Sequence, residues 1–151
     1  MTEPFESVVG LLDEEIALHR KLLTLAGDEQ RALVQGDAVE LAAVIKRQEA
    51  LVAEIRALEQ ARLSVLQLIA EREGLQMSQL TFTRLITLAG PEIALRFEEQ
   101  RETLARVLRE LAEVNKTNAL LIRDHLMYLQ TTVDLLAKAA GGTSLLVDQV
   151  T

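Results

Sequence analysis

The sequence predicts an all-α protein: an elongated antiparallel helical bundle or coiled coil with three long helices and one short helix. Hydrophobic residues make up 49% of the 151 residues and aromatic residues only 3%. Leu, Ala, Glu, Arg and Gln dominate, which is typical of long amphipathic helices. The apolar residues recur in steps of three and four, whereas a strand would show alternation. With only 7 Gly and 2 Pro, few breaks are available, so the helices must be long.

The first helix is expected over residues 3–34. Its apolar residues, beginning with Phe5, Val8 and Leu12, follow the spacing of one amphipathic helix. Pro4 is tolerated in the first turn, because the N–H group that proline lacks would have no partner there.

The second helix is expected over residues 38–73, antiparallel to the first because the link between them is short. Gly36 can end the first helix in a left-handed conformation. Asp37 can cap the second helix, and Glu40 completes a capping-box-like pair. A heptad series, typical of coiled-coil packing, follows. Its members are Leu41, Val44, Gln48, Leu51, Ile55, Leu58, Arg62, Val65 and Ile69.

A short helix and a third long helix complete the chain. Gly74 is expected to end the second helix, and Ser78 to cap a short helix over about residues 79–88. Pro91 suits the first position of the last helix, expected over residues 91–139, which would be ~70 Å long at ~1.5 Å per residue.

The boundaries of the domain follow from these helices. Residues 1–140 are expected to form a single helical-bundle domain, and residues 141–151 a short mobile C-terminal tail after Gly141-Gly142. The last helix is longer than the first two can cover, so a second copy of the chain is one way of covering it.

Composition and charge exclude several classes of function. The 16 Lys and Arg against 23 Asp and Glu give 16 − 23 = −7, and such an acidic surface repels phosphate backbones, so no nucleic-acid partner is expected. The absence of Cys excludes disulfides and thiolate chemistry. No apolar run approaches the ~18 residues of a membrane span, and no signal-peptide pattern opens the chain. We therefore expect a cytoplasmic protein without membrane insertion.

Catalytic and metal-binding patterns are also missing. The chain has only two His, His19 and His125, and no Glu-x-x-His motif of the kind found in di-iron bundles. It has neither a phosphate-binding loop nor a dinucleotide fingerprint. We therefore expect no enzyme activity, no bound metal and no cofactor.

The apolar stripe of the last helix is unusually broad over residues 118–129. One interpretation is a helix buried between two neighbours. The other is a strip that receives another amphipathic helix, in which Met127 would suit an adaptable contact.

Two asparagines, Asn115 and Asn118, interrupt the apolar pattern of the last helix. Helical spacing places both on the face that carries Leu111 and Ile122. Amides in a heptad seam lower stability but fix its register, because a misaligned buried amide stays unpaired at a cost of ~1–3 kcal/mol. Both are expected to pair with groups on a facing helix.

These asparagines carry a resemblance to a known family. "NKTNALL" (115–121) resembles the N-x-x-N-x-x-L run of the FlgN family, cytoplasmic chaperones of the flagellar type III export apparatus, and "LMYL" (126–129) fits its continuation. "ALVQGD" (32–37) resembles the family's first interhelical link, and "EALVAEIRALEQAR" (49–62) its second helix. The resemblance covers about residues 5–139.

The resemblance implies binding rather than catalysis. Members of the family hold the amphipathic terminal segments of hook–filament junction (hook-associated) proteins, keep them unassembled and pass them to the export apparatus. The C-terminal part of this chain is then expected to receive such a segment. The implied cargo-binding residues are Leu121, Leu126, Tyr128, Leu135, Leu145, Leu146 and Val147. Asn115 and Asn118 match the family motif, as register or as binding residues.

The tail departs from the family pattern, and one alternative function is open. Family members often end in a longer tail with a Tyr-Gly pair implicated in docking to an export-gate component, whereas the tail of this chain has no tyrosine.

The alternative function is a structural coiled-coil homodimer or adaptor without export cargo. In that case the stripe of the last helix is buried between identical chains.

Overall fold

The structure is a computed structural model that describes residues 3–141, and within that range it contains helices and no strands. The predicted all-α class is therefore confirmed for the described residues. The elements are α1 (Glu3–Gln35), α2 (Ala38–Glu73), the 3-10 turn η1 (Met77–Gln79), α3 (Phe82–Leu88) and α4 (Pro91–Ala140).

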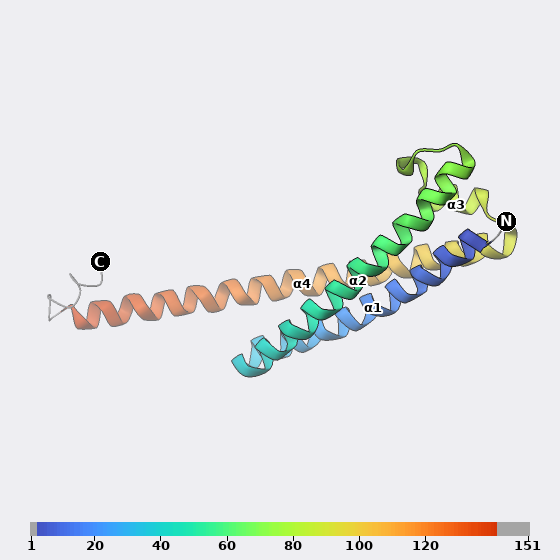
Figure 1. The fold of residues 1–151 in the computed structure, drawn as a ribbon. Coiled ribbons are helices and arrows are strands. Elements are labelled where there is room, and N and C mark those ends of the chain that lie inside the picture. The colour runs from blue at the N-terminus through green and yellow to red at the C-terminus, as the bar shows by residue number, and fades with distance from the viewer. Residues whose placement is uncertain (1–2, 142–151) are drawn as a thin grey trace.

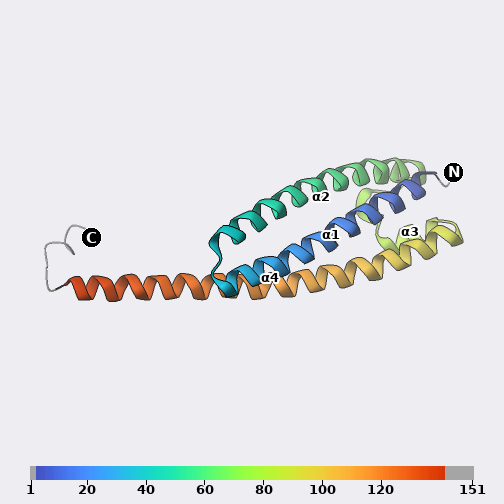
Figure 2. The same ribbon diagram turned by 90° about the horizontal axis from the view of Figure 1, so that it is seen from below.

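The three long helices lie side by side with α1 in the middle, where it contacts both α2 and α4 (Figures 1 and 2). α2 returns along α1 in the opposite direction. α4 runs parallel to α1, because Gln100 donates a hydrogen bond to the Val9 carbonyl and Asn118, further along α4, donates one to the Ala26 carbonyl. The long helices therefore run up, down and up.

Two glycines end α1 and α2 in left-handed backbone conformations, as the sequence predicts. Gly36 has a φ of 67° and Gly74 a φ of 66°, a region where a side chain would strain the backbone. Asp37 caps α2 by accepting a hydrogen bond from the Glu40 N–H at 3.0 Å. The tight link turns the chain through a hairpin, so α1 and α2 pack along their whole lengths.

The predicted cap of the short helix is wrong. Ser78 lies inside η1 and caps no α-helix. The α3 cap is instead Thr81, whose hydroxyl accepts from the Arg84 N–H at 3.2 Å, so α3 begins at Phe82. The physical reason is that the Gln79 side chain accepts from the Gln76 N–H at 2.8 Å and closes a separate tight turn before α3.

The main hydrophobic core lies at the end of the molecule where α3 packs on α4. All four α-helices contribute to it, and Phe97 of α4 is completely buried. Its buried members are Phe5, Val8, Val9, Leu12, Leu66, Ile69, Leu85 and Phe97. Burying a large apolar side chain contributes ~1.5–3 kcal/mol, so this cluster fixes where the first half of α4 lies.

A buried ion pair joins α1 to α2 nearer the middle of the hairpin. The Arg62 Nε lies 2.9 Å from a carboxylate oxygen of Glu15, a residue that is only 3% exposed. Burial raises the pKa of the Glu15 carboxyl above its ordinary value of 4.5, although the charge and hydrogen bond of Arg62 oppose this shift. The heptad series predicts Arg62 in the seam, and this pair explains how a charge is tolerated there.

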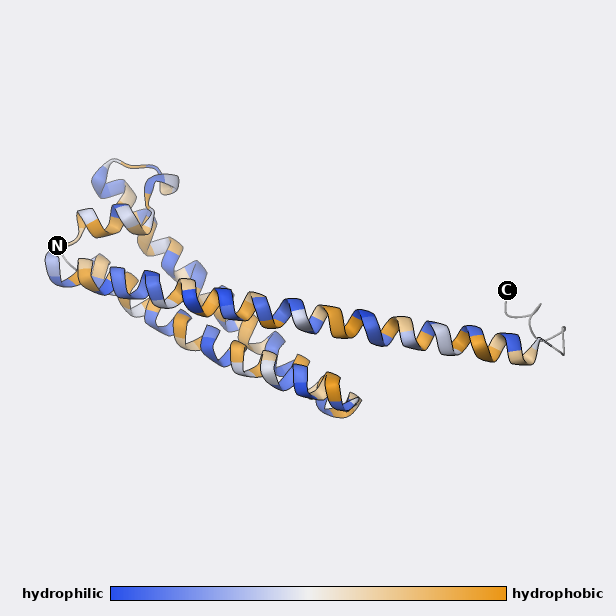
Figure 3. Ribbon diagram, turned by 180° about the vertical axis from the view of Figure 1, so that it is seen from behind, coloured by the Kyte–Doolittle hydropathy of each residue, from blue (hydrophilic) through white to orange (hydrophobic). Residues whose placement is uncertain are grey.

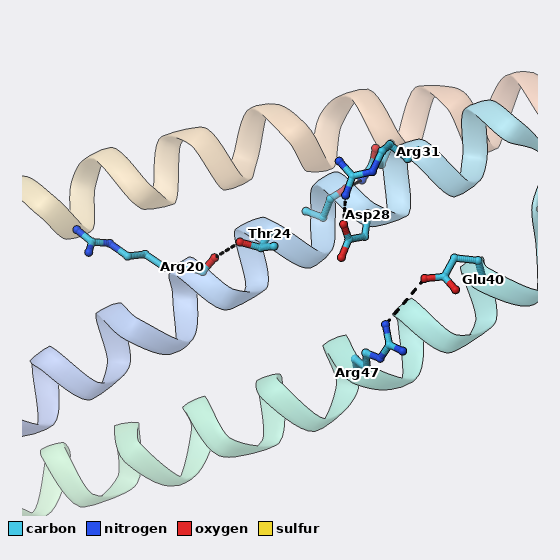
Figure 4. A network of polar contacts seen from close by, with 8 residues as sticks. Arg20, Thr24, Asp28, Arg31, Glu40 and Arg47 are labelled. Atoms are coloured by element: carbon cyan, nitrogen blue, oxygen red, sulfur yellow. Dashed lines mark hydrogen bonds and ion pairs between the residues drawn. The ribbon is translucent and has the colours of Figure 1, made fainter.

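The ion pairs near the tip of the hairpin are different in kind, because each lies within a single helix (Figure 4). Asp28 pairs with Arg31 on α1, and Glu40 lies 3.9 Å from Arg47 on α2. Exposed pairs of this type contribute a few tenths of a kcal/mol at most. They therefore support each helix locally and do little to fix how α2 packs on α1.

Candidate functional site

The C-terminal part of α4 extends beyond the α1–α2 hairpin (Figures 1 and 2). The hydrogen bonds from Gln100 to Val9 and from Asn118 to Ala26 show that α1 and α4 advance together. Continuing this match places Gln35, the last residue of α1, level with about residue 127 of α4. Residues 128–140 therefore project past the hairpin, by roughly 20 Å at ~1.5 Å per residue.

The part of α4 after Asn118, which includes the projecting residues, is rich in apolar residues, whose turns are orange in Figure 3. From Ile122 to Gly141 every residue except Thr132 is exposed. The large apolar residues that are exposed after Asn118 are Leu120, Ile122, Leu126, Met127, Tyr128, Leu129, Val133, Leu135 and Leu136. A monomeric soluble protein rarely leaves so many large apolar residues together in solvent, so this surface is a candidate binding site.

The face of α4 that packs on α1 continues uncovered along the projecting part. The buried residues of α4 are Phe97, Gln100, Val107, Leu111 and Asn118. Further steps of three and four residues along the same face lead to Ile122, Leu126, Leu129, Val133 and Leu136, which we call the uncovered stripe. Its members are between 39% and 65% exposed. One continuous apolar face therefore packs on α1 in its first half, borders the hairpin at Ile122, which lines a groove with Leu22 and Val52, and has no partner among the described residues beyond the end of α1.

The structure places the predicted cargo-binding residues of α4 on two faces. Leu126, 61% exposed, belongs to the uncovered stripe. Leu121, Tyr128 and Leu135 recur every seven residues and form a second line on a neighbouring face. Leu121 is half-buried beside the hairpin, whereas Tyr128 and Leu135 are exposed. The predicted tail residues Leu145, Leu146 and Val147 lie outside the described residues.

Sequence reasoning missed most of the uncovered stripe as a site. Ile122, Leu129 and Leu136 are part of the heptad pattern of the last helix, so the sequence alone assigns them to a core. The spacing of the stripe residues, in steps of three and four, was the sequence signal that could have identified them as one surface. What the pattern could not reveal is that α1 ends at Gln35 and leaves Leu129 and Leu136 without a covering helix.

The two asparagines have different environments, although the sequence predicts that both pair with groups on a facing helix. Asn118 is 2% exposed, and its Nδ2 donates to the Ala26 carbonyl at 2.9 Å, while its Oδ1 has no hydrogen-bond partner. Asn115 is exposed. Both line a groove formed by α1, α2 and α4, which also includes Leu22 of α1 and Val52 of α2. Asn118 thus fixes α4 against α1 just before the uncovered stripe begins, which fits a register role.

Replacing Asn118 with Asp should destabilise the protein by about 2–3 kcal/mol, because a buried carboxylate would then face the Ala26 carbonyl. Asn115→Asp makes the same chemical change at an exposed position and should alter stability by no more than about 0.5 kcal/mol. Urea unfolding of the two variants at neutral pH compares them directly. Equal effects would show that Asn118 does not hold α4 on α1.

Residues 3–141 contain no group of three or more His, Asp or Glu side chains placed to hold a metal ion. Among the helices formed by those residues, none combines the length and the apolar character that crossing a membrane requires.

Comparison with known proteins gives one match. A model of the family described as "FlgN protein" matches residues 1–146, which is nearly the whole chain. No curated protein and no solved structure matches the chain. The matched range includes the hairpin, the uncovered stripe and both asparagines.

Proposed function

Because the chain belongs to the FlgN protein family, we propose that it is an export chaperone that binds the amphipathic terminal segments of flagellar hook-associated proteins. It keeps these segments unassembled and hands them to the export apparatus. Membership of the family supports a role in flagellar export as a chaperone in general terms. We propose the choice of cargo, the binding surface and the transfer step in addition to this general role.

The observation that carries the proposal is the uncovered stripe of α4. An amphipathic helix from the cargo would lie on Ile122, Leu126, Leu129, Val133 and Leu136, and would cover the part of the apolar face that α1 leaves exposed. The polar face of the cargo helix would then remain in solvent. No rearrangement of the core at the other end of the molecule is needed.

The energetics of this site favour reversible binding. Each large apolar side chain that the cargo covers contributes up to ~1.5–3 kcal/mol. A cargo segment that is disordered before binding loses ~1–2 kcal/mol per residue of backbone entropy as it folds on the stripe. The apolar side chains of the cargo are buried as well and contribute a similar gain. With both faces counted, burial and ordering largely offset each other, so the affinity stays moderate and the cargo can be released to the export apparatus.

The second line of apolar residues extends the proposed surface. Leu121, Tyr128 and Leu135 lie beside the uncovered stripe and would contact a cargo segment that wraps around α4. Residues 145–147 of the tail are proposed to add apolar contacts. Asn115, which is exposed beside the start of the stripe, is a further candidate for a hydrogen bond with cargo.

Replacing Leu126 with Glu should weaken cargo binding at least about tenfold, because a charge would be buried in an apolar contact. Leu126 is 61% exposed, so its replacement should leave the helical content and the unfolding midpoint unchanged. The measurement is isothermal titration of the full chain with C-terminal segments of the hook-associated proteins of the same organism.

The control is Asp134→Lys, which changes a charge at an exposed position of α4 that faces away from both the stripe and the line of Leu121, Tyr128 and Leu135. This control should bind cargo with the affinity of the natural chain. If Leu126→Glu and Asp134→Lys bind equally well, the stripe is not the cargo site. If the natural chain binds none of the segments, the proposed cargo class is wrong.

A further inference from the structure

A row of polar side chains runs through the middle of the apolar surface of α4. It consists of Asn118, His125 and Thr132, and we call it the polar row. These residues recur every seven positions, so they lie on nearly the same face of the helix. Asn118 is buried against α1, whereas His125 is exposed and Thr132 is half-buried. The last two have no part in the binding surface proposed above.

The polar row separates the uncovered stripe from the second line of apolar residues. On one side His125 has Ile122 and Leu129 of the stripe, three residues before it and four after it. On the other side it has Leu121 and Tyr128 of the second line, four residues before it and three after it. Residues three and four apart are neighbours on a helix surface, and the same arrangement repeats seven residues later. A helix that covers both apolar lines must therefore cover the polar row as well.

The first half of α4 shows how polar side chains are accommodated where a helix does cover this face. Asn118 and Gln100 are 2% and 4% exposed. The Nδ2 of Asn118 donates to the Ala26 carbonyl at 2.9 Å, and the Nε2 of Gln100 donates to the Val9 carbonyl at 2.8 Å. Each amide thus obtains an acceptor from α1, since a buried donor without a partner is costly. A helix that covers the second half of α4 has to meet the same requirement.

The hydrogen-bonding groups of His125 and Thr132 determine which side chains can meet that requirement. In its neutral form the ring of His125 carries one donor and one acceptor nitrogen. The hydroxyl of Thr132 donates to the Tyr128 carbonyl at 2.9 Å, so its oxygen remains available as an acceptor. The primary amide of Asn or Gln has both donors and an acceptor and can pair with either residue, whereas Leu can pair with neither.

We propose that His125 and Thr132 select the cargo, by admitting an amphipathic helix whose apolar face carries two amide side chains seven residues apart. One amide pairs with each of these residues, and the apolar side chains beside the amides cover the uncovered stripe and the second line. These features are sufficient for recognition. The inference rests on the proposed function, because it concerns the same surface of α4.

The polar row selects for both the composition and the register of the cargo helix. A helix with an unbroken apolar face would bury His125 and Thr132 without partners. A helix with the two amides that slides by three or four residues would move them away from the row. Polar residues in a helical seam act in this way, since they reduce the affinity of every partner but reduce it most for a partner that leaves them unpaired.

The first test titrates the full chain with two synthetic amphipathic helical peptides. The amide peptide carries Asn at two positions of its apolar face seven residues apart, and the apolar peptide carries Leu at both. The ratio of their two dissociation constants is measured for the natural chain and for the double variant His125→Leu with Thr132→Val. From the natural chain to the double variant, this ratio should shift at least about tenfold in favour of the apolar peptide. Differences in helix propensity between the peptides cancel, because both proteins receive the same two peptides.

The double variant should fold normally, because it replaces one exposed and one half-buried residue of α4 and Val keeps the shape of Thr. Its circular dichroism spectrum and its mass by light scattering should match those of the natural chain. The control is Asp134→Leu, which adds a leucine at an exposed position of α4 that faces away from both apolar lines. It should keep the ratio of the natural chain.

The second test changes the spacing of the amides and keeps the composition of the peptide. In the shifted peptide one Asn exchanges places with a Leu of the same apolar face, so the amides lie four residues apart. The natural chain should bind the shifted peptide at least about tenfold more weakly than the amide peptide, because only one amide can then reach the polar row. The double variant should bind the two peptides with similar affinity.

The outcomes separate this inference from the proposed function. If the hook-associated segments bind but the ratio is the same for the natural chain and the double variant, the inference is overturned and the proposed function stands. The same holds if the segments bind and neither the amide peptide nor the apolar peptide does, or if the natural chain does not distinguish the amide peptide from the shifted peptide. If neither the segments nor the peptides bind, the proposed function fails and the inference fails with it.

Discussion

Replacing Phe97 with Ala is expected to lower the free energy of unfolding by about 3–5 kcal/mol. Phe97 is 0% exposed and lies in the only cluster to which all four α-helices of the described residues contribute. Its removal leaves a cavity between α4 and the hairpin that α3 cannot fill, because α3 is a single short helix of 7 residues. Urea unfolding followed by circular dichroism measures the loss, and the midpoint temperature should fall by roughly 2–4 °C per kcal/mol.

The control for Phe97→Ala is Leu95→Ala, on the same turn of α4. Leu95 is 56% exposed, so its truncation should change stability by no more than about 0.5 kcal/mol. Similar losses for both variants would mean that this end of α4 does not pack as described. Cargo affinity of the folded Phe97→Ala protein should stay normal, because the core and the uncovered stripe lie at opposite ends of α4.

The parts of the fold that sequence reasoning predicted are those set by local chemistry. The steps of three and four predict helices, and Asp37, Gly36 and Gly74 mark helix ends through contacts within a few residues. The misplaced cap shows the limit of such reasoning. Ser78 and Thr81 are both acceptable caps, and the choice between them depended on a competing turn closed by Gln79.

The candidate site was predicted less well, because it depends on which face each neighbouring helix covers. Asn115 and Asn118 are three residues apart on one helix, yet α1 buries only Asn118. Leu126 and Leu129 have the spacing of a core and are exposed, since the end of the hairpin lies away from α4 (Figure 1) and α1 stops at Gln35. Periodicity identifies an apolar face but not the length over which it is covered.

Glu15 shows that sequence reasoning is also limited in predicting which charged residues are buried. In the sequence it is one of many Glu residues on a helix, which usually indicates a solvated face. In the structure it is 3% exposed beneath Arg62, whose side chain is 29% exposed and reaches towards solvent. The position of Arg62 in the heptad series was the available signal, because a buried guanidinium needs an anion within reach.

Replacing Arg62 with Leu is therefore expected to destabilise the protein by about 3 kcal/mol at pH 7.5, because it leaves the Glu15 carboxylate buried without its partner. The loss should depend on pH. Burial already holds the pKa of Glu15 above its ordinary value of 4.5, and removing Arg62 also removes the charge that does most to lower it. The folded variant then binds the Glu15 proton more tightly than the unfolded chain does, so stability rises as the pH falls through the raised pKa towards 4.5.

Urea unfolding of Arg62→Leu and the natural chain at pH 7.5 and at pH 5 measures this dependence, and the difference between them should be smaller at pH 5. A difference that is equal or larger at pH 5 would show that the effect of Arg62 comes from packing of its side chain and not from its charge. The double variant Glu15→Leu with Arg62→Leu separates these contributions further. It removes the unpaired charge and keeps apolar volume at both positions, so it should recover most of the lost stability and show no dependence on pH from this site. A double variant as unstable as Arg62→Leu alone would mean that α1 and α2 need the ion pair itself to hold their register.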